Sequence, residues 1–173
     1  MKKSSILVIC TGNSCRSQMA EGYLKYFSNK LNIDVNILSA GVKAEGLNPK
    51  AVETMSNDNI DISNQTSNTI DEYINEDISH VITVCDHAHE NCPVYLKKSN
   101  IFHYNFTDPS KIKGEKKTID IAYEKCREEI KDFTYSFLLN KIYIRLNKLN
   151  DYYYNNIEDR KDKLLVKEDL EDI

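Results

Sequence analysis

The residues best suited to chemistry lie in one short segment near the start of the chain, Cys10-Thr-Gly-Asn-Ser-Cys-Arg-Ser17. We expect this segment to be a loop that leads into a helix, where free backbone N–H groups and the helix dipole attract tetrahedral oxyanions. Gly12 allows the backbone to curl close to an anion, and Asn13 tolerates a left-handed backbone conformation. The planar guanidinium of Arg16 can bind two oxygens of the same anion. The segment therefore predicts an oxyanion-binding site.

Cys10 is the candidate nucleophile of this loop. A thiol beside a helix N-terminus and a guanidinium has a lowered pKa, so we expect Cys10 to react as a thiolate. We also expect the hydroxyl of Ser17 to donate a hydrogen bond to the Cys10 sulfur. The alternative is that Cys10 is a buried structural residue and that Arg16 only caps the helix or lies in solvent.

Cys85 and Cys92 form a second group that could do chemistry. The chain has five cysteines, an odd number in a protein large enough to fold without disulfides. Under reducing conditions such cysteines are more often catalytic, redox-active or metal-binding than structural. Two histidines stand within the pair, so the order Cys85, His87, His89, Cys92 offers side chains of the types that bind zinc. Considered alone, the pair would more often be two small buried side chains.

The elements that must position these residues are predicted by the apolar pattern. Short β-branched runs predict strands at 5–10, 35–40, 80–85 and 101–106, and periodic apolar residues predict helices at 16–31, 49–55 and 118–149. Strands that alternate with helices predict an α/β fold with a four-stranded parallel sheet flanked by helices. Such sheets bind ligands at the carboxyl ends of their strands, so Cys10, Cys85 and residues 106–108 should converge on one edge.

Composition limits the kinds of partner. Hydrophobic residues make up 40% of the 173 residues and charged residues 29%, which suits one domain with a packed core. The net charge is −4 with no basic stripe, so we expect no nucleic-acid partner. The longest apolar run, 6–10, is too short to span a membrane, and no signal-peptide pattern follows it. We therefore expect a cytoplasmic protein with no membrane partner.

The segment ICTGNSCRSQMAEG (9–22) resembles the active-site loop of the low-molecular-weight protein tyrosine phosphatase fold, and more narrowly its thioredoxin-coupled arsenate reductase branch. The resemblance covers about residues 4–140 and continues through SAG (39–41), NPKA (48–51), DISNQTS (61–67), VITVCD (81–86), NCP (91–93) and DP (108–109). It implies that arsenate, with phosphate or sulfate as a mimic, is bound by Thr11, Gly12, Asn13, Ser14, Cys15, Arg16 and Ser17.

The resemblance also implies a relay of three cysteines. Cys10 would attack arsenic, with Asp108 as the general acid for the departing hydroxyl, and Cys85 would then attack the Cys10 sulfur and release arsenite. Cys92 would move the disulfide to Cys85–Cys92, where thioredoxin would reduce it. Because the two outer cysteines are separated by six residues, the segment between them must rearrange to form a disulfide. We therefore predict a loop or weak helix of low stability at 86–91.

Two other functions stay open at this point. A low-molecular-weight protein tyrosine phosphatase would use the same Cys10, Arg16 and Asp108, and its phosphate substrate is nearly isosteric with arsenate. A zinc-binding or redox-sensing module would instead use Cys85, His87, His89 and Cys92. The second cysteine pair favours the reductase, because hydrolysis needs only the first cysteine and an acid.

Asp108 and Pro109 follow the fourth predicted strand. Proline fixes the backbone after the acid, and Asp108 could protonate a leaving group if the nearby site raises its pKa. The alternative is a simple turn-forming pair. Phosphatases of this fold usually carry a tyrosine after the Asp-Pro pair, whereas Ser110 stands here, so we do not expect a pocket for an aromatic substrate.

Some arsenate reductases of this branch bind potassium beside the loop. The matching positions here are Asn13, Glu21, Ser39, Thr66 and Asn68. Asn68 stands where potassium-binding members carry an aspartate, and Gln65 stands where some relatives carry a histidine. We therefore expect no metal and no other cofactor, with potassium as an open alternative, and we expect Glu21 and Ser39 to support the loop through Asn13.

The remaining features are assigned as structural. We expect Cys15 and Cys126 to pack rather than to react. Residues 1–140 should form the catalytic domain and 141–173 a helical or disordered C-terminal extension, since the charges at 158–173 are typical of a solvated terminus. We expect the protein to be a monomer.

Overall fold

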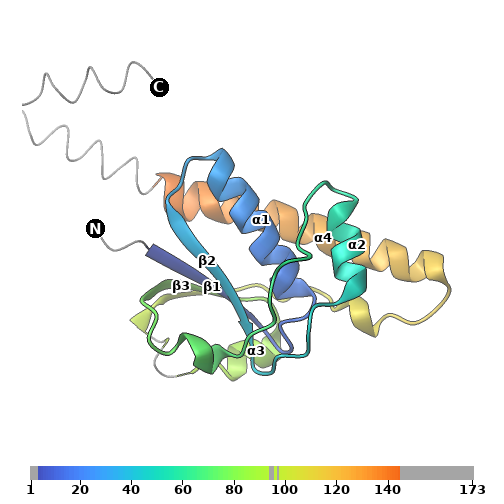
Figure 1. The fold of residues 1–173 in the computed structure, drawn as a ribbon, viewed down its shortest axis with the longest axis horizontal. Helices are drawn as coiled ribbons and strands as arrows, with labels where there is room; N and C mark the ends of the chain where they lie inside the picture. The colour runs from blue at the N-terminus through green and yellow to red at the C-terminus, as the bar shows by residue number, and fades with distance from the viewer. Residues whose placement is uncertain (1–3, 94–95, 97, 145–173) are drawn as a thin grey trace, which may run out of the picture. The chain divides into compact units, whose positions relative to one another are not determined.

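The computed structural model describes residues 4–93, 96 and 98–144 of the chain. Within them, one parallel sheet has the strand order β2-β1-β3-β4, which confirms the predicted α/β fold (Figure 1). Its strands are β1 (Ser4–Cys10), β2 (Val35–Gly41), β3 (Ile78–Thr83) and β4 (Asn100–His103). β1 lies between β2 and β3, and four consecutive side chains of its apolar run are fully buried, Ile6, Leu7, Val8 and Ile9. A strand buried on both faces is what this continuous apolar run predicts.

The helices are distributed unevenly around the sheet. They are α1 (Arg16–Lys30), α2 (Pro49–Ser56), α3 (Asp86–Glu90) and α4 (Lys116–Phe137), with shorter helical turns at η1 (Ile70–Tyr73), η3 (Pro109–Lys111) and η4 (Leu138–Tyr143). α4 packs against α1 and α2, and these three helices lie on one side of the sheet in Figure 1, whereas α3 contacts β1 and β3. None of the helices in the described ranges combines the length and apolarity that crossing a membrane requires.

The chain divides into two compact units, Met1–Leu138 and Leu139–Ile173. The sheet, helices α1 to α4 and the loop from Cys10 to Ser17 all belong to the first unit. In the second unit the charged segment 158–173 lies outside the described residues. The predicted boundary at residue 140 and the predicted state of the extension therefore stay predictions.

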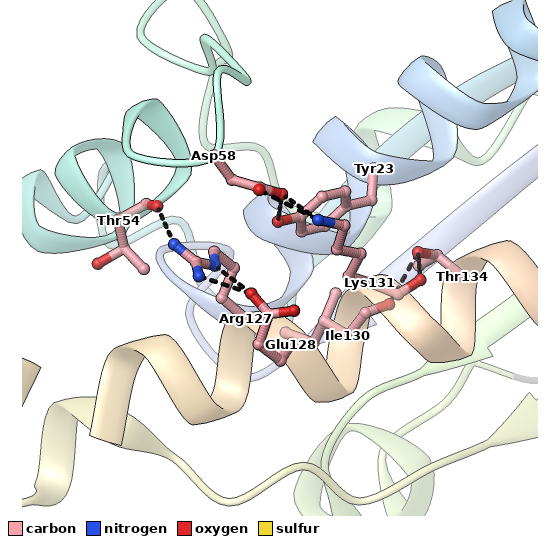
Figure 2. A network of polar contacts seen from close by, with 8 residues as sticks. All are labelled: Tyr23, Thr54, Asp58, Arg127, Glu128, Ile130, Lys131 and Thr134. Carbon is pink, nitrogen blue, oxygen red and sulfur yellow. Dashed lines mark hydrogen bonds and ion pairs between the residues drawn. The ribbon is translucent and has the colours of Figure 1, made fainter. Parts of the chain in front are cut away.

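A polar network fastens α4 to α1 and α2 (Figure 2). Asp58 accepts hydrogen bonds from the Tyr23 hydroxyl at 2.6 Å and from Lys131 Nζ at 2.8 Å. Arg127 donates to the carbonyl of Thr54 at 3.1 Å. Burial would raise the pKa of Asp58, but the hydrogen bonds from Lys131 and Tyr23 outweigh burial and hold the pKa below its ordinary value. The network satisfies the hydroxyl of a tyrosine whose side chain is fully buried.

The strand predictions at 80–85 and 101–106 were wrong at their ends. β3 stops at Thr83 and β4 stops at His103, because the two strands pair only over four residues each, up to the partners Thr83 and His103. Neither segment is a regular strand beyond Thr83 and His103, although the backbone N–H of Phe106 still donates to the carbonyl of Val84 at 3.4 Å. The two segments therefore run on together toward the site without forming regular sheet.

The long helix predicted over 118–149 is confirmed as far as residue 144, although its type changes along the way. α4 is α-helical from Lys116 to Phe137, and η4 continues the helix as a π-helix from Leu138 to Tyr143. The Thr134 hydroxyl donates to the carbonyls of Ile130 and Lys131 one turn earlier, a contact that commonly bends a helix. Residues 145–149 lie outside the described residues.

Candidate active site

The loop between β1 and α1 has the shape that its sequence predicts. β1 ends at Cys10, α1 begins at Arg16, and Asn13 between them has a φ of 45°, in the left-handed region. The backbone of Gly41 at the end of β2 passes so close that a Cβ there would lie 2.6 Å from the Asn13 nitrogen. The loop is therefore curled against the sheet edge by close backbone packing that only a glycine permits.

Cys10 lies at the base of this loop with 4% of its surface exposed. Its sulfur accepts a hydrogen bond from the Asn13 amide at 3.1 Å and lies 2.9 Å from the Ser17 hydroxyl, as predicted. Hydrogen-bond donors aimed at a sulfur stabilise negative charge on it. The geometry thus suits a thiolate nucleophile rather than a cysteine that only fills space.

A buried network holds Asn13 in its unusual conformation. The side-chain nitrogen of Asn13, Nδ2, donates to Ser39 at 2.7 Å and to Ser17 at 3.0 Å. Its side-chain oxygen accepts from the backbone N–H of Asn68 at 2.7 Å. Ser39 in turn donates to the Glu21 carboxylate at 2.5 Å. The structure therefore places Glu21 and Ser39 where the sequence analysis predicts loop support.

The positions considered for potassium are joined to one another by hydrogen bonds. In addition to the contacts of Asn13, the Thr66 hydroxyl donates to the Asn68 side chain at 2.6 Å. The ammonium group of Lys25 forms an ion pair with Glu21. A cation from the chain itself thus balances the buried carboxylate of this network.

Arg16 and Asp108 contact each other directly across the rim of the loop. Arg16 Nη2 lies 2.7 Å from Asp108 Oδ2, and Arg16 Nη1 donates to the carbonyl of Phe106 at 2.9 Å. The other oxygen of Asp108 accepts hydrogen bonds from the amide and hydroxyl of Ser110, at 3.1 and 2.6 Å. Asp108 therefore both caps the turn η3 and lies at the anion loop, so the two interpretations of this residue are compatible.

Cys85 lies beside the loop and Cys92 lies beyond the helix that follows. The sulfur of Cys85 is 3.4 Å from the hydroxyl of Thr11, the residue after Cys10, and 5% of Cys85 is exposed. Cys92 is partly exposed, and its amide donates to the carbonyl of His89 at 3.3 Å. Both are free thiols. The predicted loop or weak helix between them is the short helix α3.

The zinc interpretation has no support in the geometry. Across residues 4–93, 96 and 98–144, no three side chains of the His, Cys, Asp or Glu type gather as a possible metal site. His89 Nδ1 lies 3.3 Å from the Thr83 hydroxyl, and the His89 ring lies beside that of His103 with centroids 4.3 Å apart. The set Cys85, His87, His89 and Cys92 therefore forms no metal centre in this structure.

Cys15 and Cys126 are buried, as predicted for packing residues. Cys15 precedes α1 with 6% of its surface exposed, and Cys126 on α4 has 3% exposed. Burial raises the pKa of Cys15 far above its ordinary value and that of Cys126 to about 12. Thiols held in this state are poor nucleophiles at neutral pH.

Gln18 and Glu45 are among the residues that contact the loop without having been predicted to do so. Gln18 is fully buried and donates to the carbonyls of Asn13 and Thr66, at 3.0 and 2.9 Å. No sequence pattern marked Gln18, because the first turns of the predicted helix already carry the polar residues Arg16, Ser17 and Glu21. Glu45 donates its amide to the Gly12 carbonyl at 2.9 Å, and its carboxylate lies where a Cβ on Gly12 would be. No sequence pattern marked Glu45.

Comparison with known proteins places this loop and fold in a family. Residues 5–148 match the family described as low molecular weight phosphotyrosine protein phosphatase. The chain belongs to this family. An arsenate reductase of Halalkalibacterium halodurans is 42% identical over 130 residues, which are 75% of this chain and 91% of that protein.

Solved structures of similar proteins show the same architecture. A structure titled as an arsenate reductase in the phosphate binding state has a TM-score of 0.59 and 26% identity, covering 77% of this chain and 97% of that one. The low molecular weight protein tyrosine phosphatase from T. tengcongensis has a TM-score of 0.66 and 27% identity, covering 81% and 100%. The family resemblance predicted from the loop is confirmed.

Proposed function

We propose that this protein is an arsenate reductase that transfers oxidising equivalents from Cys10 to Cys85 and then to Cys92. The observation that carries the proposal is the contact of the Cys85 sulfur with Thr11, at the edge of the loop that holds Cys10. A relative that is 42% identical over most of its length is an arsenate reductase, which supports the same activity. Arsenate is the expected substrate, because the loop is built for a tetrahedral oxyanion.

In the first step, the Cys10 thiolate attacks arsenic and forms a sulfur–arsenic bond. One oxygen of arsenate leaves as water, and we assign the proton it needs to Asp108, which lies at the rim beside Arg16. Arg16 and the backbone N–H groups of the loop bind the remaining oxygens.

In the second step, the thiolate of Cys85 attacks the sulfur of Cys10. A disulfide forms between the two residues while the sulfur–arsenic bond breaks, and its electron pair stays on arsenic. Arsenic is thereby reduced from the pentavalent to the trivalent state, and arsenite leaves. The thiol pair supplies the two electrons.

In the third step, the thiolate of Cys92 attacks the Cys85 sulfur and releases the Cys10 thiolate. The Cys85–Cys92 disulfide then needs a dithiol reductant, for which we propose thioredoxin. Partial exposure of Cys92 supports access by such a partner. Thioredoxin coupling, a monomeric state and a cytoplasmic location remain part of this proposal.

Arsenate-dependent NADPH consumption tests the proposal. The protein is supplied with thioredoxin and thioredoxin reductase, and a parallel reaction contains glutaredoxin and glutathione instead. We expect consumption with thioredoxin that requires arsenate and is lost in Cys85→Ser. Consumption only with glutaredoxin would overturn the thioredoxin assignment, and no arsenate-dependent consumption with either system would overturn the reductase.

A low molecular weight protein tyrosine phosphatase is the second candidate. Cys10, Arg16 and Asp108 suffice for phosphate-ester hydrolysis, and a phosphatase from T. tengcongensis shares the fold at 27% identity. Ser110 hydrogen-bonds Asp108 where phosphatases usually carry a tyrosine, which argues against an aromatic phosphoester as the main substrate. Hydrolysis of an aryl phosphate at a rate exceeding arsenate reduction would favour this candidate.

We propose that the reaction needs no metal or other cofactor. The ion pair of Lys25 with Glu21 supports this for potassium, because the ammonium group already supplies a positive charge to the loop network. Equal arsenate reduction in potassium and in tetramethylammonium buffers of the same ionic strength is the expected result. A severalfold gain in potassium would contradict it.

A further inference from the structure

α3, the helix between Cys85 and Cys92, is tied to the strands beside it by polar side chains that none of the proposed steps uses. We call this set the α3 tether; its members are Thr83, Asp86, His89, His103 and Asn105. Asp86 and His89 lie on α3, Thr83 ends β3, and His103 ends β4. The tether thus joins the helix to both strands at the sheet edge that carries the site.

Asp86 binds the β4 side of the tether with both carboxylate oxygens. Its Oδ1 accepts from His103 Nε2 at 3.0 Å, and its Oδ2 accepts from Asn105 Nδ2 at 2.6 Å. Asp86 directly follows Cys85 and is the first residue of α3. Its fixation therefore also fixes the backbone next to the Cys85 sulfur.

A second chain of contacts passes through the buried hydroxyl of Thr83. His103 Nδ1 lies 2.8 Å from this hydroxyl, and His89 Nδ1 lies 3.3 Å from it. With a neutral His103 that donates from Nε2, its Nδ1 accepts from Thr83, and the threonine oxygen accepts from His89. His103 is thus the one tether residue that contacts both Asp86 and Thr83.

We infer that His103 is a positioning residue for the disulfide relay. It holds α3 folded beside the loop during the first exchange, and its contacts with α3 break when the helix unwinds for the second. The inference rests on the proposed function. In the closed state, Cys85 lies against Thr11 beside the nucleophile. In the second exchange, Cys85 and Cys92 must approach to disulfide distance although they flank the helix, so α3 has to unwind. Unwinding breaks the contacts of Asp86 and His89.

The test compares His103→Ala with His87→Ala, a histidine on the same short helix whose side chain is outside the tether. The first readout is amide hydrogen exchange over 86–91, which we expect to rise about fivefold or more in His103→Ala and to stay unchanged in His87→Ala. The second is the rate of single-turnover arsenite release in a Cys92→Ser background. We expect His103→Ala to slow it about three- to tenfold, because Cys85 is held less well.

The third readout follows conversion of the Cys10–Cys85 disulfide to Cys85–Cys92 after acid quenching, by mass mapping. His103→Ala should speed this conversion, because the unwinding that precedes it no longer breaks the tether. His103→Gln should restore amide protection in large part, since its amide nitrogen can donate to Asp86. Hydrolysis of an aryl phosphate by Cys10 reports whether the loop itself is folded in each variant.

Two results would overturn the inference while the proposed function stands. One is arsenite release and disulfide conversion at parental rates in His103→Ala. The other is an equal change in His87→Ala and His103→Ala, which would show general loosening of the helix. Absence of arsenite release from the parent protein would instead overturn the proposed function itself.

Discussion

At the scale of single residues, the site depends on Asn13. Its side-chain amide donates to Ser17 and Ser39 and accepts from the backbone N–H of Asn68, and its own backbone N–H donates to the Cys10 sulfur. This residue also holds a left-handed backbone conformation, with a φ of 45°. One side chain therefore shapes the loop and, through the loop, the nucleophile.

Replacement of Asn13 separates these two contributions. Asn13→Ala should lower turnover about tenfold or more, because it loses the network and places an alanine in left-handed backbone. Asn13→Gly keeps the backbone freedom and loses only the network, so it should lie between the alanine variant and the parent. The measurement is aryl phosphate hydrolysis, which reports Cys10 without the relay. Equal activity of Asn13→Ala and the parent would contradict this account of the loop.

At the scale of elements, α3 and α4 are held differently. α4 is fastened to α1 and α2 by a partly buried network around Asp58, whereas α3 has five residues, buries only Ala88 and contacts His103 through the exposed Asp86. Elements with few buried contacts open at lower free energy than core helices. This difference suits a fixed scaffold beside a segment that rearranges in each cycle.

The Asp58 network predicts a pH dependence of stability. Hydrogen bonds hold the pKa of Asp58 below its ordinary value, so its contribution is present above about pH 4 and is lost as the pH falls through the folded-state pKa. The pKa of Tyr23 is raised mainly by burial and next by its contact with Asp58. The folded protein therefore holds this proton more tightly than the unfolded chain does, and stability should also fall above about pH 10. Urea unfolding across this pH range measures both losses of stability, which we call the acid limb and the alkaline limb.

Variants assign these limbs to the network. Asp58→Asn should weaken the acid limb and cost about 1–3 kcal/mol at neutral pH, because Lys131 and Tyr23 lose their charged acceptor. Asp132→Asn, an exposed position on the same helix, is the matched control and should change stability little. An unchanged acid limb in Asp58→Asn would show that other carboxylates cause it.

At the scale of the whole molecule, the features that could be predicted are those that depend on residues close together in the sequence. The apolar runs predicted the parallel sheet, and the segment from Cys10 to Ser17 predicted the loop, its left-handed asparagine and the contact of Ser17 with sulfur. Strand ends were wrong because pairing with a neighbour, not the apolar run, decides where β3 and β4 stop. Contacts between distant segments, such as Arg16 with Asp108, have no local signature.

The five cysteines should also differ in reactivity across the molecule. Burial raises the pKa of Cys15 and Cys126, so an alkylating reagent at neutral pH should modify them last. Cys92, which is partly exposed, should be modified well before these two. Mass mapping of modified peptides over time measures the order, and Cys126→Ala should retain arsenate reduction. Early modification of Cys126 would contradict its assignment as a packing residue.

The proposed relay requires three sulfurs to react in a fixed order, and a trapped intermediate would reveal that order. Cys92→Ser is mixed with excess arsenate and quenched, and arsenite and disulfides are both determined. We expect at most one arsenite per protein molecule, a disulfide joining Cys10 to Cys85, and retained hydrolysis of an aryl phosphate by the unreacted variant. Repeated turnover by Cys92→Ser with thioredoxin, or arsenite release without that disulfide, would contradict it.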